Sequence, residues 1–261
     1  MRVADPLFAA APSNLQKVQI DHSFLTFVKR FGAGKSTAAQ FLVEEHGFTR
    51  LPFAGPLKQM ALEIGFTDVE ISVGKEQPFD WGALPVELTS RRALRAISRL
   101  VPLGWLHPEV SHLPRPVLGG KSVDQAIADL RAWYAADRPA WRTPRIFLQR
   151  LGTEWGRERI YPEIWVEAWR HNLAINAVEH FGDEIIVADD CRFENEARAI
   201  RAEGGKIVRI ERPGSGSASG AAHASENGVR PDITIQNDGP PEVLRARILG
   251  VLDRYFAAEA I

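Results

Sequence analysis

The sequence predicts an α/β fold in which helices cover a mostly parallel β-sheet. Short apolar runs alternate with helical segments toward both ends of the 261-residue chain, and such alternation is typical of parallel strands joined by right-handed crossovers. A Gly-containing turn directly follows the first apolar run, at Phe31–Ala39. The segment Asp68–Pro116 interrupts the alternation with many Pro, Trp and Gly residues. The pattern therefore indicates an α/β core that carries an insertion.

Periodicity and boundary residues predict the elements in order. Apolar residues gather in the run that ends at Val28, which predicts the first strand, and Ser36–Glu45 contains neither Gly nor Pro, which favours a helix. Pro56 stands early in the next helix, where its missing N–H is tolerated. The same criteria predict strands at 48–53, 184–188, 206–210 and 232–236, and helices at 56–64, 89–100, 122–136, 145–156, 162–180, 194–203 and 241–256.

Chain length predicts one domain that spans residues 1–261, because a chain of this size can bury a sizeable core. Within it we expect residues 1–16 to form a loose N-terminal arm. About residues 68–160 should form an inserted helical region that binds substrate or acts as a lid. The segment Pro213–Ala224 is rich in Gly, Ser and Ala, which predicts a mobile loop.

Composition narrows the class of protein. A hydrophobic content of 45% and a charged content of 25% are ordinary for a soluble globular protein. The net charge of −1 argues against a partner that is a nucleic acid polymer. No apolar run approaches transmembrane length, so we expect no membrane partner. The single cysteine, Cys191, excludes an internal disulfide framework and fits a reducing cytosol.

The basic residues are mostly arginine. Only seven of the 32 are Lys, and the other 25 are Arg, whose planar fork binds phosphate and carboxylate oxygens bidentately. A GC-rich genome would produce the same bias, so both readings stay open.

The turn FGAGKSTAA predicts a phosphate-binding loop. It lies between a predicted buried strand and a predicted helix, which is the context that such a loop requires. Its backbone N–H groups and the amino end of the helix would bind phosphate oxygens. Lys35 would reach the β- and γ-phosphates, and the Ser36 hydroxyl would ligate Mg²⁺. The loop departs from the usual pattern at Lys29, which stands where the first Gly is expected.

A second candidate is the strand end IIVADDCRF at Ile185–Phe193. Ligands of open parallel sheets bind beyond the carboxyl ends of the strands. One of Asp189 and Asp190 would hold Mg²⁺ or accept a proton, while Arg192 would bind a phosphoryl group. The alternative is that one aspartate caps the next helix and pairs with Arg192.

The third candidate is the Arg-rich stretch from Arg138 to Arg159. On a regular helix Arg150, Glu154 and Arg157 would share one face, and Arg145 would share another with Gln149 and Gly152. Several arginines around the phosphates are what phosphoryl transfer needs. The alternative is a solvated helix face with local ion pairs.

Three further segments carry weaker signals. Lys58, in FAGPLK, would approach an acceptor phosphate or would simply be solvated. HASE at His223–Glu226 begins within the predicted mobile loop and extends beyond its end. In DITIQNDG at Asp232–Gly239, Asn237 and Asp238 would contact a base or, more commonly, cap the last helix.

Taken together, six segments resemble the phage-type deoxynucleoside monophosphate kinase family. They occur in the family's order and span about Phe24–Tyr255 in pieces, with residues 68–140 outside the resemblance. LQRLGTEWGR and DDCRFENEA are more specific than the phosphate loop itself. The segments are GKSTAAQFL, FAGPLK, LQRLGTEWGR with IYPEIWV, DDCRFENEA with GGKIVRIERP, HASE, and DITIQNDG.

The resemblance implies a P-loop three-layer α/β/α fold with a helical substrate-binding or lid insertion. It also implies direct, Mg²⁺-assisted transfer of the ATP γ-phosphate to a deoxynucleoside 5′-monophosphate. The residues that would carry the family roles fall into four groups: ATP binding by Gly32, Ala33, Gly34, Lys35, Ser36 and Thr37; acceptor binding by Lys58, Arg145, Gln149, Arg150, Glu154, Trp155 and Arg157; catalysis by Lys35, Arg150, Asp190 and Arg192; and metal binding by Ser36 and Asp190.

Several questions stay open at the level of sequence. Trp155 or Trp165 would stack on the acceptor base, although a Trp at helical spacing more often belongs to the core. A small-molecule kinase similar to dephospho-coenzyme A kinase, or a non-catalytic nucleotide-binding module with a degenerate loop, are alternative functions. We expect a bacterial or phage-infected host cytosol as the compartment. The sequence leaves base preference and oligomeric state open, a homodimer included.

Overall fold

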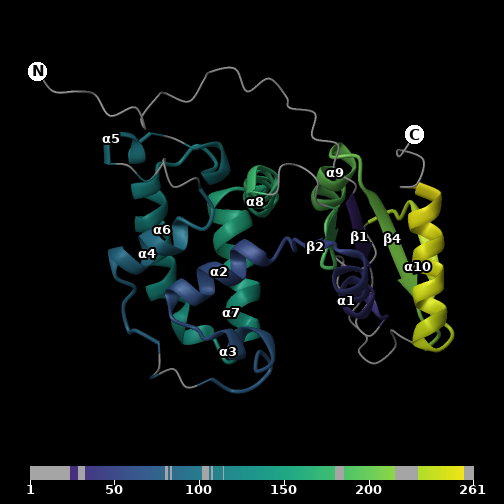
Figure 1. Cartoon of the computed structure of the whole chain (residues 1–261). Helices are drawn as coiled ribbons and strands as arrows, with labels where there is room; N and C mark the ends of the chain where they lie inside the picture. Colours follow the sequence, from purple (N-terminus) through teal and green to yellow (C-terminus); the bar gives the residue numbers. More distant parts are fainter. Residues whose placement is uncertain are drawn as a thin grey trace, which may run out of the picture.

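Five parallel strands form the centre of the α/β part of the chain (Figure 1). The computed structural model describes residues 24–28, 33–79, 82, 84–101, 106, 108–113, 115–179, 185–214 and 229–255. The strand order is β2-β3-β1-β4-β5, and each neighbouring pair is parallel. The strands are β1 (Phe24–Val28), β2 (Thr49–Arg50), β3 (Ile186–Ala188), β4 (Lys206–Glu211) and β5 (Ile233–Gln236).

Helices connect and cover these strands. The predicted helices are all present among the described residues, with boundaries shifted by a few positions. The helices are α1 (Lys35–His46), α2 (Gly55–Ile64), α3 (Asp68–Ser72), α4 (Ser90–Ile97), α5 (Pro108–Ser111), η4 (Pro116–Leu118), α6 (Val123–Asp137), η5 (Arg138–Ala140), α7 (Pro144–Arg150), η6 (Leu151–Ile160), α8 (Ile164–Glu179), α9 (Glu194–Ala202) and α10 (Pro241–Tyr255).

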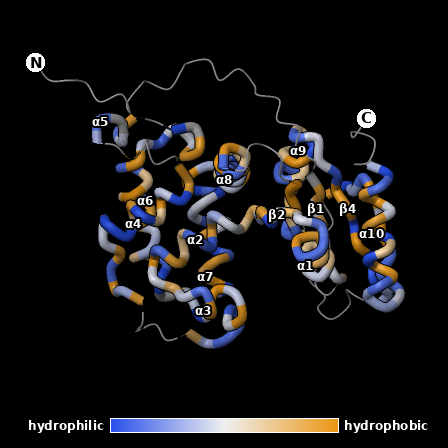
Figure 2. Tube along the Cα trace, in the orientation of Figure 1, coloured by the Kyte–Doolittle hydropathy of each residue, from blue (hydrophilic) through white to orange (hydrophobic). Residues whose placement is uncertain are grey.

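Side chains that alternate along the strands divide the sheet into two buried faces. Val187 packs with apolar residues of α1 and α10, whereas its neighbours Ile186 and Ala188 pack with α8 and α9. Figure 2 shows that β1 is largely hydrophobic, while α10 alternates between hydrophobic and hydrophilic residues. The arrangement is a three-layer α/β/α fold with an all-parallel sheet, which confirms the predicted fold class.

A separate hydrophobic cluster holds the helical region together. It joins apolar side chains from Met60 to Ala168, and the fully buried Trp141 and Trp155 are among its largest members. In Figure 1 these helices lie to one side of the sheet, and α8 stands between them and the strands. Helix α8 contributes to this cluster and also to the cluster that contains Ile186 and Ala188 on one face of the sheet. It therefore links the helical region to the sheet.

The segment from Leu151 to Ile160 differs from the expected regular helix. It is a π helix, η6, that follows α7 directly, and the N–H of Tyr161 closes it with a bond to the Gly156 carbonyl five residues back (2.9 Å). Bonding to the fifth residue widens each turn, so residues seven apart no longer lie above one another. The predicted shared face of Arg150, Glu154 and Arg157 is therefore wrong for Arg157.

Candidate active site

Ala33 and Gly34, at the described end of the predicted phosphate-binding loop, lead into α1 and are held from the end of β5. Gly34 has a φ of 100°, and a Cβ there would lie 2.7 Å from Nδ2 of Asn237. Asn237, which follows β5 and is buried, donates from that nitrogen to the Ala33 carbonyl (2.9 Å). Glycine is thus the residue that fits position 34. Lys29 and Gly32 lie outside the described residues, as do residues 1–16, His223–Glu226 and most of the Pro213–Ala224 loop.

Ser36 meets a carboxylate at the edge of the sheet. Its Oγ donates to Oδ2 of Asp189 (3.1 Å), the residue that follows β3. Arg50, at the end of β2, donates from Nε to Oδ1 of Asp189 (3.1 Å). Its Nη2 forms an ion pair with Oδ2 of the same carboxylate. Asp189 is buried, at 7% exposure, and these partners replace the hydrogen bonds that water would otherwise supply to its carboxylate. The loop hydroxyl and the strand-end carboxylate thus offer adjacent oxygens to a cation.

Asp190 faces another way. Its carboxylate oxygens accept the backbone N–H groups of Phe53 (2.9 Å) and Ala54 (2.8 Å), where α2 begins without a side-chain cap of its own. Burial raises the pKa of Asp190, and the two N–H bonds oppose that shift. The sequence interpretation chose Asp190 as the partner of Ser36, whereas the structure places Asp189 there. Asp190 caps α2, the helix that carries Lys58.

Lys75, whose carbonyl contacts the amino end of α7, interacts electrostatically with three other cations that come from separate segments. Burial lowers the pKa of Lys75, and the positive charges of Arg145, Lys58 and Arg192 lower it further, while Glu76 opposes the shift. The N–H of Arg145 donates to the Lys75 carbonyl (2.9 Å), and the Arg145 guanidinium pairs with the exposed Glu76. Nε of Arg145 is buried and has no hydrogen-bond partner among the described residues. Mutually repelling cations with an unsatisfied donor form an environment suited to an anion.

Arg150 is engaged within the helical region. Its guanidinium binds Asp137 with two nitrogens, Nε at 2.6 Å from Oδ2, and approaches Oε2 of Glu154 at 2.9 Å. Asp137 also accepts the indole N–H of Trp141 (2.7 Å). Burial raises the pKa of Glu154 although Arg150 lowers it. Arg150 and Glu154 are therefore neighbours as predicted, but the partner that fixes Arg150 is Asp137.

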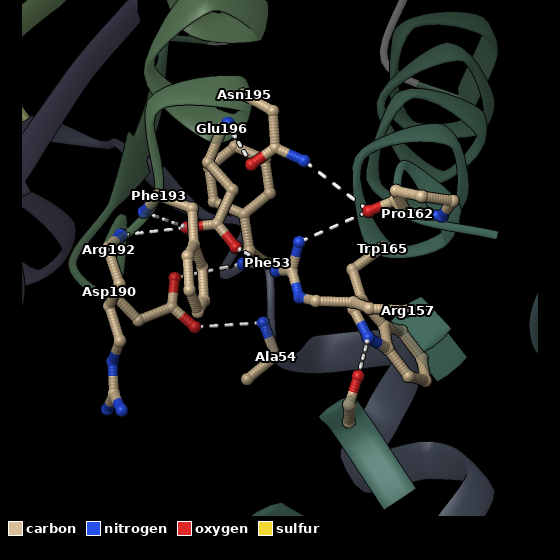
Figure 3. A network of polar contacts seen from close by, with 11 residues as sticks. Phe53, Ala54, Arg157, Pro162, Trp165, Asp190, Arg192, Phe193, Asn195 and Glu196 are labelled. Carbon is tan, nitrogen blue, oxygen red and sulfur yellow. Dashed lines mark hydrogen bonds and ion pairs between the residues drawn. The ribbon is translucent and has the colours of Figure 1, made fainter. Parts of the chain in front are cut away.

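The Arg157 side chain extends to Glu196 of α9 (Figure 3). Its guanidinium donates to Oε1 of Glu196 (2.7 Å) and lies over the Phe193 ring, 4.1 Å from the centroid. The other Glu196 oxygen accepts the N–H groups of Arg192 (2.7 Å) and Phe193 (3.1 Å). Burial raises the pKa of Glu196 to about 7 against the opposing effects of these donors.

The tryptophans of the family motif are core residues. Trp155 has no exposed surface, and Trp165 is 3% exposed with its indole N–H bound to the Gly152 carbonyl (2.8 Å). Neither ring therefore has a free face on which a base would stack. Gln149, in contrast, is exposed at the end of α7.

Sequence reasoning missed three residues of this region: Arg50, Lys75 and Glu196. Arg50 lies inside the predicted strand 48–53, and only the shorter observed strand, β2, brings it to the carboxyl edge of the sheet where ligands bind. Lys75 lies between α3 and α4, and nothing in the sequence indicates that this connection packs against α7. Glu196 is the third residue of its helix, three residues after Phe193. A glutamate at this position commonly accepts the backbone N–H of the residue that precedes the helix, so the spacing carried a signal.

Among the described residues there is no group of three or more His, Cys, Asp or Glu side chains that would hold a metal ion. Ser36 and Asp189 fit Mg²⁺ nonetheless, because this hard cation prefers oxygen ligands and commonly takes only one or two from the protein beside phosphates and water. The helices of the described residues include none long and apolar enough to cross a membrane.

Comparison with known proteins agrees with the resemblance seen in the motifs. Residues 121–248 match the family model of deoxynucleotide monophosphate kinase. The chain is also 25% identical, over 236 residues, to a protein of Acanthamoeba polyphaga mimivirus named "Putative deoxynucleotide monophosphate kinase". That alignment covers 85% of this chain and 92% of the viral protein.

Proposed function

Because residues 121–248 belong to the deoxynucleotide monophosphate kinase family, we propose that the protein phosphorylates deoxynucleoside 5′-monophosphates to diphosphates with ATP. The observation that carries this proposal is the contact between the loop hydroxyl of Ser36 and the strand-end carboxylate of Asp189 (3.1 Å). In enzymes with such a loop, a hydroxyl and an aspartate in this relation hold the metal of a bound nucleoside triphosphate.

The donor site is built on the phosphate loop. Backbone N–H groups around Gly34 and the amino end of α1 bind the β- and γ-phosphates, and Lys35 and Thr37 stand in the first turn of that helix. Mg²⁺ would be held by Ser36 and Asp189 and would neutralise charge on the phosphates as the bond to the leaving group breaks. In this proposal Asp189 takes the metal-binding role that the sequence interpretation gave to Asp190. Arg50 keeps Asp189 oriented toward Ser36.

The acceptor phosphate binds among Lys58, Lys75, Arg145 and Arg192. These side chains come from α2, the α3–α4 connection, α7 and the segment after β3, so a phosphate among them would draw the helical region toward the sheet edge. Phosphate oxygens would satisfy the buried Nε of Arg145 and replace Glu76 as its anionic partner. Gln149 and Glu154 lie farther along the same helical segment, where they would contact the nucleoside of the acceptor.

The chemistry is an in-line displacement without a covalent enzyme intermediate. An oxygen of the acceptor phosphate forms a bond to the γ-phosphorus while the bond to the β–γ bridging oxygen breaks, and ADP leaves. Lys35 and Arg192 stabilise the charge that the transferring group carries between the two nucleotides. The enzyme acts in the cytosol of a bacterium or an infected host, where both nucleotides are dissolved.

A coupled assay of ADP release tests the proposal. Purified protein with ATP and Mg²⁺ should release ADP when a deoxynucleoside monophosphate is added, and the product should be the matching diphosphate. Dephospho-coenzyme A serves as the competing acceptor. ADP release with dephospho-coenzyme A alone would favour the small-molecule kinase. Measurable ATP binding without turnover on any deoxynucleotide would instead favour a non-catalytic module.

A further inference from the structure

Glu196 binds more donors than a helix cap needs. It is 3% exposed and is one of the few charged side chains buried among the described residues. As the third residue of α9, it reaches back with Oε2 to the N–H groups of Arg192 and Phe193, which satisfies the amino end of the helix. Its remaining oxygen would ordinarily face water. Here it accepts from Arg157 of η6 (2.7 Å), so one carboxylate joins the sheet to the helical region.

Arg157 is itself held from several sides. Its side chain is 16% exposed, its guanidinium covers the Phe193 ring, and Nη1 donates to the Pro162 carbonyl (3.3 Å). The preceding residue, Gly156, packs so closely on α8 that a Cβ there would lie 2.6 Å from the Trp165 ring. The direction of Arg157 is therefore fixed by the packing of η6 on α8.

The segment that Glu196 holds carries Arg192. Asp190 anchors the start of that segment on the N–H groups of Phe53 and Ala54, and Glu196 anchors its end (Figure 3). The Arg192 side chain is exposed, and its guanidinium makes none of the contacts drawn in Figure 3. The segment 190–193 is thus held at both ends, while the exposed Arg192 side chain is left to meet a ligand.

We propose that Glu196, paired with Arg157, is a positioning residue that sets the backbone of Arg192 relative to the helical region and the acceptor site. This inference rests on the proposed function, because Arg192 is assigned there to the transferring phosphate. Glu196 touches neither nucleotide; it acts through the two N–H groups it binds.

The test compares Glu196→Gln with Glu194→Gln. Both replace a glutamate of α9 by its isostere, but Glu194 has a half-exposed side chain and, within the described part of the chain, forms an ion pair with Arg201 alone. In Glu196→Gln the amide NH₂ cannot accept from Arg157, so one of the two attachments is lost. We expect kcat to fall on the order of tenfold to a hundredfold, with the KM for ATP within about twofold of wild type, since a small displacement of a reacting group has effects of that size. Glu194→Gln should match wild type.

Two further measurements separate positioning from a general structural effect. In the background of Arg192→Ala, adding Glu196→Gln should cost less than about twofold more in kcat, because the residue through which it acts is absent. Hydrogen exchange at the amides of Arg192 and Phe193 should speed up in Glu196→Gln and stay unchanged in Glu194→Gln. Should Glu196→Gln not fold, Arg157→Lys gives the same readouts, because Lys keeps the charge but loses the planar fork.

Several outcomes would overturn the proposal. A kcat for Glu196→Gln equal to that of Glu194→Gln would do so, and so would a full, additive loss in the Arg192→Ala background. Unchanged exchange at both amides would contradict it without any activity measurement. If the wild-type protein transferred no phosphate, the proposed function would fail, while the exchange experiment would still report whether Glu196 fixes the segment.

Discussion

Gly156→Ala tests the packing of η6 on α8, which directs Arg157. An ideal Cβ at position 156 would lie 2.6, 2.9 and 3.0 Å from three atoms of the Trp165 indole, closer than such contacts normally occur. The ring cannot turn away easily, because it is buried and its N–H binds the Gly152 carbonyl. Either the ring or the helix must move, and such overpacking costs about 1–3 kcal/mol.

A matched variant isolates that cost. Gly250 lies within α10, and a Cβ there would meet nothing within 4 Å. Alanine has a better helix propensity than glycine by about 1 kcal/mol at both positions, so Gly250→Ala should stabilise the protein. The free energies of unfolding of the two variants, measured in urea, should differ by about 1–3 kcal/mol, or roughly 2–4 °C in Tm per kcal/mol. Equal stability, or a more stable Gly156→Ala, would refute the packing argument.

Three other changes test separate parts of the site. Lys35→Ala should lower kcat by about a hundredfold or more; activity within a few fold of wild type would remove Lys35 from its role. Asp189→Asn should raise the Mg²⁺ concentration for half-maximal activity by about tenfold or more, whereas Asp190→Asn should leave that midpoint unchanged; the reverse result would restore Asp190 as the metal ligand. Glu196 has a pKa raised from 4.5 to about 7, so the native state keeps a proton that the unfolded chain releases. Its contribution to the free energy of unfolding should therefore fall as pH rises from about 4.5 to 7, by about 3 kcal/mol in total. Urea titrations at several pH values should show this fall in the difference between the free energies of unfolding of wild type and Glu196→Gln. A pH-independent difference would contradict the buried environment of Glu196.

The sheet and most helices could be predicted from sequence because their signals are local. Thr89 and Ser122, for instance, begin α4 and α6 by accepting an N–H three residues on, which a sequence pattern can anticipate. The short helices α3 and α5 were not anticipated, since five or four residues give too little periodicity.

The site was harder to predict because its partners come from distant segments. The sequence indicated that an aspartate after β3 would meet Ser36, but only the packing of β3 beside β1 decides between Asp189 and Asp190. Similarly, the helical spacing of Arg150 and Arg157 assumed a regular helix, whereas η6 winds more widely and turns Arg157 toward Glu196. Lys75 joins Arg145 through the fold alone, since the two are far apart in the chain.

The most direct test of the account is a crystal structure of the protein with Mg²⁺, a non-hydrolysable ATP analogue and a deoxynucleoside monophosphate. The account predicts the metal between Ser36, Asp189 and the triphosphate, with the acceptor phosphate among Lys58, Lys75, Arg145 and Arg192 and in line with the γ-phosphorus. An acceptor phosphate bound beside Arg150, with Glu76 still paired to Arg145, would contradict it.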